Sequence, residues 1–559
     1  MDRNLIGRYL LILLAAVFPT TLAAQVYVTP TVAPTPPGTL ISVNNSMGGS
    51  QFYPHVSGDL VCYANFDTNG VFTVHYFDLS KSADAAVPPD PTAQRDYLCD
   101  VRGSTIAFTR LTNTDSQIYT FDTSGAGSPA PVSFKANASR GFAEIGDQAI
   151  VWQENFSSVP AISSIVAYNR SSGTTQSLSS DTSFNQEPGI SADGTVVVWS
   201  DCVSVSTCNI WKAILANGTW SAQQLVSQIQ GQGPQSHPDT DGTTIVYAAH
   251  VVVNGAGASR LVWQPVGGAE EQVLNLPGFS FTPSISGGLI AFINLSGANS
   301  DLLLYDVAAN VLYNLTADLT AAGLYPSGLD SVLPDISVTL DGKVRVVWQV
   351  TTAQSNYNVY AYTFNLPATT SSIGNLIGNL LGAGCIDNGG IANALTSKLF
   401  AAQAEIAAGN IQTAINTLTA LISQINAQAG KHIATSCTIG GVAFDPVTVL
   451  LADVQGLINS LKVSGIADPI AGYVVDANGA GVSGATLSIL DAGKNTVTTT
   501  TTDVTGFYFF ATTGGLVPGS SYTVAVTGFP AGFTTSTPAA SLAFTWAGTG
   551  MMVGTFVLK

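Results

Sequence analysis

Five side chains that can exchange protons or hold a cation occupy one position of a repeated ten-residue phrase. The phrase occurs seven times between residues 54 and 348, and each copy leads from a turn-like start through a hydrophobic run to an aromatic residue. Its third residue is valine or isoleucine in six copies, whereas its second residue is an acid in four copies and a histidine in a fifth. In chain order, the second residues are His55, Asp100, Glu144, Gly189, Asp239, Ser284 and Asp335.

The chemistry open to these side chains depends on whether the seven copies surround one axis. If they do, four carboxylates and one imidazole converge near a central channel, where like charges in partial burial raise their pKa values or recruit a cation. An oxygen-rich ring of that kind suits Ca²⁺, although the sequence names no metal. The alternative is that these side chains cap strand ends and line a water-filled channel. The candidate ligand or cation site therefore consists of His55, Asp100, Glu144, Asp239 and Asp335.

The spacing of the phrase predicts the elements that hold these residues. The copies recur about every 45 residues, and each is followed by a second β-rich run, as at residues 74–78 and 117–122. Such a period is typical of one four-stranded sheet per repeat, closed radially into a β-propeller. We predict a mainly β, multidomain chain with a seven-bladed propeller over residues 42–366, with six or eight blades as alternatives. The last repeat carries an insertion around residues 321–333, so an N-terminal strand is a candidate to complete the closing blade.

The aromatic residues that end the phrases are predicted to pack inside the sheets rather than to form a carbohydrate platform. They are Tyr63, Phe108, Trp152, Trp199, Tyr247, Phe292 and Trp348.

The fullest copy of the phrase, Pro-Gly-Ile-Ser-Ala-Asp-Gly at residues 188–194, resembles the repeat of TolB-like propellers. Partial matches begin at Pro54, Pro283 and Pro334. The resemblance implies a propeller of the kind that serves in the bacterial envelope, and it implies no single activity. Seven copies depart from the six blades usual for TolB.

The N-terminus predicts export. Arg3 and Arg8 precede an apolar run over residues 9–18 and a small-residue exit over 21–24, which is typical of a Sec-type signal peptide spanning residues 1–24. We expect a periplasmic, cell-surface or extracellular protein without a transmembrane segment. Residues 25–41 are rich in proline and threonine, so we predict a stiff spacer that forms no β-ladder.

Six cysteines in an exported chain predict three disulfides, and their spacing resembles no zinc site. The pairings that sequence proximity favours are Cys62 with Cys99, Cys202 with Cys208, and Cys385 with Cys437.

The charge composition limits the classes of partner that the protein can bind. Only 9% of the residues are charged, and the net charge is −17. Nucleic acid and anionic membranes are therefore disfavoured. We expect a monomer whose partner is an envelope or extracellular protein or glycan.

Two further modules follow a predicted linker over residues 367–384. Residues 385–463 carry helical periodicity, with a stop at Gly409-Asn410 and a start at Asp445-Pro446, and predict three helices. The residues from Leu395 to Ile433 resemble the FIMAH module of secreted bacterial proteins, and we expect Lys431 and His432 to be solvated. Residues 464–559 alternate as β-strands and resemble the carboxypeptidase regulatory-like domain, a transthyretin-like sandwich, which implies an accessory module.

No nucleophile elbow, phosphate-binding loop or paired metal-ligand histidines occurs in the sequence. We therefore predict no catalytic residues and no enzyme, but a binding or scaffold protein that recognises a protein or glycan through its propeller. One alternative is an extracellular polysaccharide hydrolase or lyase that uses the acids of the candidate site with His55. Another is a TolB-like structural component of the envelope.

Overall fold

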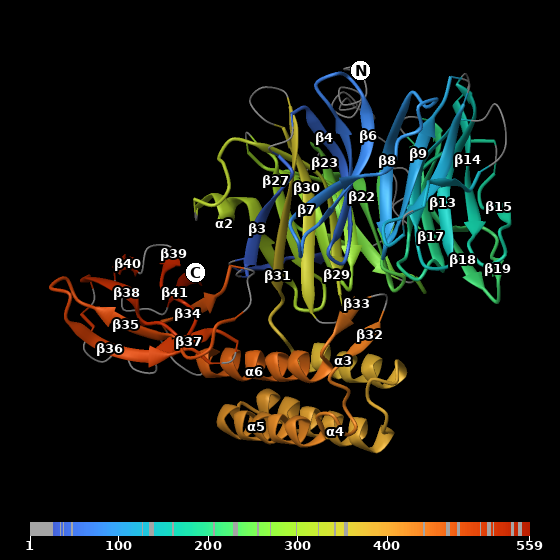
Figure 1. The fold of residues 1–559 in the computed structure, drawn as a ribbon. Coiled ribbons are helices and arrows are strands. Elements are labelled where there is room, and N and C mark those ends of the chain that lie inside the picture. Colours follow the sequence, from blue (N-terminus) through green and yellow to red (C-terminus); the bar gives the residue numbers. More distant parts are fainter. Residues whose placement is uncertain are drawn as a thin grey trace. The chain divides into compact units, whose positions relative to one another are not determined.

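The computed structural model describes residues 26–559 except for gaps at 34, 37, 46–47, 114, 126, 134–138, 159–160, 181, 205–206, 227–232, 254–255, 269, 298, 322, 340–341, 352–355, 440–441, 465–469, 478–480, 504, 511–515, 518, 538–540 and 546–550. The predicted signal peptide lies outside the described residues. The chain divides into two compact units, the first mostly Leu40–Val338 and Arg345–Tyr362, the second mostly Thr363–Lys559. Figure 1 labels their strands and helices.

The first unit is built from successive groups of antiparallel strands, and seven such groups lie within its described residues. Groups 1 to 3 consist of β4 (Ser50–Ser57), β5 (Leu60–Phe66), β6 (Phe72–Asp78) and β7 (Ala83–Ala86); β8 (Arg95–Arg102), β9 (Thr105–Leu111), β10 (Ser116–Asp122) and β11 (Ala130–Pro131); and β12 (Ser139–Ile145), β13 (Ala149–Ser158), β14 (Ala161–Asn169) and β15 (Thr175–Ser177).

Groups 4 and 5 consist of β16 (Phe184–Ile190), β17 (Val196–Ser204), β18 (Thr207–Ala216), β19 (Thr219–Trp220) and β20 (Gln224–Leu225); and β21 (Gln235–Thr240), β22 (Thr244–Val253), β23 (Ala256–Pro265) and β24 (Gln272–Leu274). Groups 6 and 7 consist of β25 (Phe279–Ser286), β26 (Leu289–Leu295), β27 (Asp301–Asp306) and β28 (Val311–Asn314); and β29 (Asp330–Val338), β30 (Lys343–Thr351), β31 (Tyr357–Asn365) and β3 (Gly38–Val43). A short helix, α2 (Leu315–Ala321), follows group 6.

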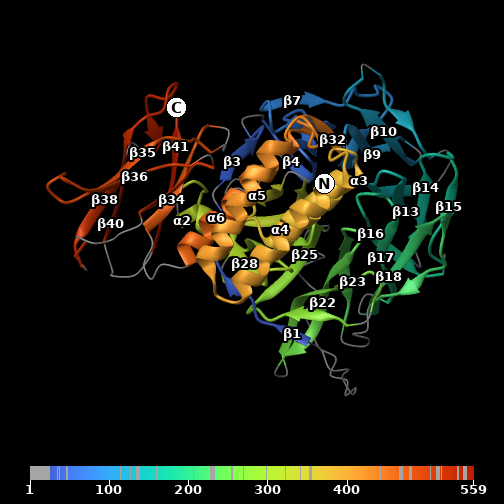
Figure 2. The same cartoon turned by 90° about the horizontal axis from the view of Figure 1, so that it is seen from below.

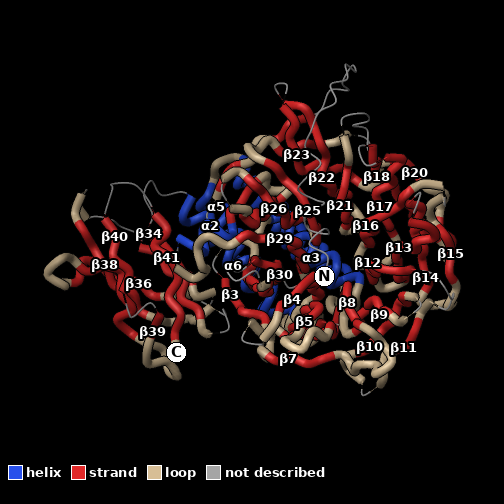
Figure 3. Tube along the Cα trace, turned by 90° about the horizontal axis from the view of Figure 1, so that it is seen from above, coloured by secondary structure: helices blue, strands red, loops and turns tan. Residues whose placement is uncertain are grey.

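The groups are arranged radially, as predicted for a propeller. The first strand of each group lies beside the first strands of the preceding and following groups, and β29 lies beside β4, which closes the ring. Figure 3 shows these innermost strands around the axis, with β7, β11, β15 and β20 at the rim. The N-terminal strand β3 supplies the outermost strand of group 7, so the prediction that an N-terminal strand completes the closing sheet is confirmed.

The segment before β3 differs from our prediction of a spacer without a ladder. β1 (Val26–Val28) pairs in parallel with β24, and β2 (Thr31–Val32) pairs in parallel with β28. The Thr31 N–H donates to the Asn310 carbonyl at 3.0 Å. The prolines do not prevent this pairing, because an edge strand needs only one of its two sides to bond and Pro30 falls between the two strands.

The seven phrase-ending aromatic residues are all at most 1% exposed, so the prediction that they form core is confirmed. Their burial against the β-branched residues of adjacent groups holds the sheets together.

Three disulfides join the pairs that the sequence predicted. The Cys62–Cys99 bond connects β5 of group 1 to β8 of group 2, whereas Cys202 and Cys208 face each other across β17 and β18.

The helical part of the second unit holds four helices in its described residues, three of them within the predicted three-helix module and one in the predicted linker. They are α3 (Thr370–Gly382), α4 (Gly389–Ala407), α5 (Ile411–Gln428) and α6 (Pro446–Ser464). The predicted linker is mostly α3, in which Ile373, Leu376, Ile377 and Leu380 are buried at helical spacing and Thr369 forms a capping box with Ser372. Figure 2 shows α4 beside α5. A short hairpin, β32 (Cys437–Ile439) with β33 (Val442–Phe444), precedes α6.

The predicted helix end at Gly409-Asn410 and the predicted helix start at Asp445-Pro446 both agree with the structure. Gly409 adopts a φ of 77° just beyond α4. Asp445 caps α6 by accepting the Val447 N–H at 2.9 Å, with Pro446 as the first helical residue.

The C-terminal residues form a β-sandwich, as predicted. One sheet has the order β37 (Phe507–Phe510), β34 (Ile470–Val475), β41 (Met551–Leu558), β39 (Ser536–Thr537). The other has the order β36 (Thr496–Thr501), β35 (Thr486–Leu490), β38 (Ser521–Gly528), β40 (Ser541–Thr545). Buried residues from both sheets form one core. None of the helices among the described residues is long and apolar enough to cross a membrane.

Candidate binding site in the central channel

The innermost strands bring all five predicted site residues together. Nδ1 of His55 lies 3.4 Å from an Asp100 oxygen and 3.8 Å from an Asp335 oxygen. One ligand atom each from His55, Asp100 and Glu144 lies within 4.8 Å of the others. Asp239 is near enough for its charge to act on Glu144, and Asp335 acts on Asp239 in the same way. We call these five residues the channel ring; their role in binding stays a prediction.

The aspartates of the channel ring also fasten one strand group to the next. Asp100 accepts the Ile145 N–H at 2.7 Å, and Asp335 accepts the Val56 N–H at 2.7 Å across the closure of the ring. Asp239 accepts the equivalent N–H of group 6 at 2.8 Å. The expectation that these side chains bond backbone groups is confirmed for the aspartates. The side chains of Asp100 and Asp335 nevertheless keep 11% and 18% of their surface accessible.

Two copies of the phrase have a residue without an ionisable side chain at the second position, Gly189 and Ser284. A Cβ on Gly189 would lie 2.7 Å from the Pro238 carbonyl oxygen, so the close approach of β16 to β21 requires glycine there. Ser284 contributes a hydroxyl, which donates to Asp335 Oδ1 at 2.8 Å. The polar character of the ring therefore extends into group 6 without another charge.

His55 carries a positive charge near neutral pH. Burial alone would lower the pKa of His55, but Glu144, Asp100 and Asp335 outweigh burial and raise that pKa to about 10. The side chain remains 29% accessible, so the protonated imidazole is only partly covered. This group can donate a hydrogen bond to a ligand.

The pKa values of three carboxyl groups of the ring are raised as well, which favours their neutral forms. Burial and the nearby Asp100 raise the pKa of Glu144 well above its usual range, although His55 partly offsets them. Burial, with Asp335, raises the pKa of Asp239 to about 7. Burial also raises the pKa of Asp335. The raised pKa values favour the neutral forms of these three carboxyl groups, which lie close to the protonated His55.

The donor set of the channel ring differs from the one that calcium usually takes. Ca²⁺ prefers six to eight oxygen ligands. Here His55 offers a nitrogen that is protonated near neutral pH, and Asp100 already accepts backbone N–H groups with both oxygens. The Ca²⁺ expectation stays a prediction.

A second ring of side chains lies two residues before the channel ring in each innermost strand. Each strand holds one non-glycine residue with φ between 46° and 54°. In groups 1 to 6 the pairing register with the second strand shifts there, which marks a β-bulge. We call these residues the bulge ring: Tyr53, Leu98, Phe142, Glu187, His237, Thr282 and Leu333.

No feature of the sequence predicts the bulge ring. Bulky residues avoid positive φ, and such a conformation costs on the order of 1–3 kcal/mol each. Five of the seven residues also precede proline, which favours an extended conformation instead. The packing of the innermost strands overrides both preferences, as the same departure occurs in every group.

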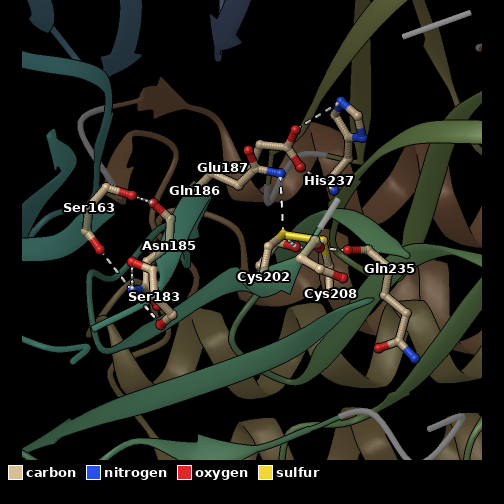
Figure 4. The surroundings of a disulfide bond; sticks show 11 residues. Ser163, Ser183, Asn185, Gln186, Glu187, Cys202, Cys208, Gln235 and His237 are labelled. Carbon is tan, nitrogen blue, oxygen red and sulfur yellow. Dashed lines mark hydrogen bonds and ion pairs between the residues drawn. A yellow bond between two sulfur atoms is a disulfide. The ribbon is translucent and has the colours of Figure 1, made fainter. Parts of the chain in front are cut away.

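One part of the bulge ring lies beside the Cys202–Cys208 disulfide, as Figure 4 shows. Glu187 Oε2 accepts the His237 N–H at 2.8 Å, and Glu187 Oε1 lies 3.6 Å from His237 Nε2. Gln186 places its amide nitrogen 3.7 Å from Cys202 Sγ. The disulfide thus closes the hairpin behind the Glu187–His237 pair.

Comparison with protein-family models finds a match in one part of the chain. A model of the SdrD B-like domain family matches residues 471–543, which lie in the C-terminal sandwich. No curated protein matches the chain. The carboxypeptidase regulatory-like and FIMAH resemblances stay predictions.

The fold resembles that of solved propeller proteins. A puromycin-hydrolysing peptidase of Mycobacterium tuberculosis is 15% identical, with a TM-score of 0.41 over 60% of this chain and 54% of its own, so this chain spans about half its length. A putative TolB of Agrobacterium tumefaciens is 14% identical, with a TM-score of 0.31 over 41% of this chain and 81% of its own. An oligogalacturonate lyase in complex with manganese is 11% identical, with a TM-score of 0.43 over 60% of this chain and 98% of its own.

These comparisons correct our prediction that the protein is not an enzyme. That prediction treated the recognisable parts as belonging to non-catalytic classes, whereas the solved structures of similar fold include peptidases and a lyase. Structural likeness at these sequence identities and TM-scores shows the fold alone. It assigns none of those reactions to this chain.

Proposed function

We propose that this envelope-type β-propeller protein binds a glycan at the mouth of its central channel. The observation that carries the proposal is the channel ring, in which one imidazole and four carboxyl groups from five strand groups converge. Three disulfides fit an oxidising compartment outside the cytoplasm, where such a ligand is met.

A glycan suits this ring because its hydroxyl groups both donate and accept hydrogen bonds. His55 donates, and the carboxyl oxygens of the ring accept. Asp239, with its pKa raised to about 7, can also carry a proton and donate near neutral pH. A buried polar group that finds no partner costs about 1–3 kcal/mol, so a ligand of complementary hydroxyl pattern gains selectivity here. The net charge of −17 opposes polyanions.

The test is a glycan-array screen of the mature protein, followed by calorimetric titration of the strongest hits. The Asp100→Asn/Asp335→Asn double variant removes two acceptors and is expected to weaken binding at least tenfold. The matched control is Asp122→Asn/Glu270→Gln, which removes two exposed carboxylates away from the ring. Each protein is titrated with added Ca²⁺ and with chelator, so that a calcium requirement appears as binding lost on chelation alone.

A polysaccharide lyase is the second candidate, and one observation favours it. Glu144, with its raised pKa, lies within 4.8 Å of Asp100 and His55, which places a proton-exchanging group among charged partners. Incubation of bound glycans would reveal a lyase by new ultraviolet absorbance from an unsaturated product, absent with Glu144→Gln.

A further inference from the structure

The bulge ring is a second layer of the same channel. Each of its residues stands two positions before a channel-ring position on the same innermost strand, toward the strand's beginning. The side chains reach the neighbouring group: Glu187 accepts the His237 N–H, and Leu98 Cδ1 lies 3.6 Å from the Cβ position of Gly141. A ligand that enters from the side where the innermost strands begin therefore meets the bulge ring before the channel ring.

The bulge ring is chemically divided. Leu333, Tyr53, Leu98 and Phe142 occupy four consecutive groups and form an apolar arc. The remaining three groups present Glu187, His237 and Thr282.

Aromatic surface at the apolar arc is available for contact. Phe142 is 39% exposed, an unusual fraction for phenylalanine on an innermost strand. Burial raises the pKa of Tyr53 most. The nearby phenols of Tyr357 and Tyr97 raise it further, so the three rings lie close together. Phe52 packs 4.9 Å from Tyr357, centroid to centroid, behind them. Flat aromatic faces of this kind pack well against the CH face of a sugar ring.

We propose that the ligand is a glycan with free amino groups, whose sugar ring stacks on the apolar arc while its ammonium group lies beside the carboxyl group of Glu187. This inference rests on the proposed function and narrows it to one substrate class. Charge complementarity selects the class: the mouth combines carboxylates with aromatic faces that attract cations, on a strongly acidic protein. An N-acetylated sugar keeps the stacking and loses the charge, whereas a uronate is repelled.

The test compares two oligosaccharides of equal length, one of glucosamine and one of N-acetylglucosamine, by calorimetric titration at pH 6.5 in low salt. We expect the free-amino oligomer to bind at least tenfold more tightly, with the difference shrinking as salt is added. Glu187→Gln, which keeps the size of the side chain and removes its charge, is expected to reduce that difference several-fold. Phe142→Ala is expected to weaken both oligomers, and because Phe142 is partly exposed the variant should fold, which circular dichroism checks.

Spermidine, a polyamine without a sugar ring, separates recognition from charge attraction. Spermidine binding as tight as that of the glucosamine oligomer would overturn the inference, because the apolar arc would then contribute nothing. Equal binding of the two oligosaccharides, or binding only of other glycans, would overturn the inference and leave the proposed function standing. Absence of binding to every glycan on the array would overturn both.

Discussion

The recurring aspartates each serve two purposes at the level of single residues. Asp100, Asp239 and Asp335 accept a backbone N–H from the next strand group, and they also belong to the channel ring. The phrase that identifies the fold in the sequence is therefore the same feature that makes the channel acidic. Its repetition follows from packing between groups, and the ligand chemistry depends on the positions that differ, such as His55 and Glu144.

His55 makes the stability of the propeller depend on pH. Its folded pKa of about 10 exceeds its ordinary value of 6.5, so its contribution is fully present below about pH 6.5 and is lost as pH rises toward 10. We expect the melting temperature of the wild type to fall between pH 7 and 9.5, and His55→Gln to show a shallower fall. His432→Gln, an exposed site in the second unit, is the control. Identical slopes for His55→Gln and the wild type would contradict the assignment of the charge to His55.

Gly189 is the residue at which a single methyl group should disturb the ring. A Cβ there would meet the Pro238 carbonyl oxygen at 2.7 Å and the Asp239 Cα at 3.1 Å. We expect Gly189→Ala to lower the free energy of unfolding by about 1–3 kcal/mol, measured by denaturant titration. Gly267→Ala, where no atom lies within 4 Å of the new Cβ, should change it little. Equal stabilities of the two variants would show that β16 and β21 are farther apart than described.

At the scale of elements, two disulfides in the propeller differ in the length of chain that they close. Cys62–Cys99 spans 37 residues and joins two strand groups, whereas Cys202–Cys208 spans 6 within one hairpin. On the chain-entropy account, removing the first by paired alanine substitution should cost about 4 kcal/mol and removing the second about 2 kcal/mol. Thermal unfolding of the two double variants measures this order, and a larger loss from the short loop would contradict it.

Most elements of the propeller could be predicted from the sequence, because the repeat sets both strand order and the position of Asp100, Asp239 and Asp335. The failures have local causes. Gly374, Gly378 and Gly382 lower the helix propensity of α3, so burial of its apolar face decides the helix and the sequence pattern was read as a linker. Tertiary packing also decides β1, β2 and the positive φ values of the bulge ring, which local preferences oppose.

At the scale of the whole molecule, the chain holds two compact units, and buried cores are found in each of them. We expect calorimetry to resolve at least two unfolding transitions. Gly189→Ala should lower the propeller transition and leave that of the second unit in place. A single transition that moves as a whole in this variant would contradict independent units.

The proposed binding site lies in the first unit, whereas the C-terminal β domain lies in the second. The decisive question is whether a ligand contacts the channel ring.

The measurement that answers it most directly is calorimetric titration of the strongest glycan hit against the wild type, the Asp100→Asn/Asp335→Asn variant and the Asp122→Asn/Glu270→Gln control. The account predicts affinity at least tenfold weaker in the first variant and unchanged in the control. Undiminished binding by a folded Asp100→Asn/Asp335→Asn protein would place recognition elsewhere and contradict the account.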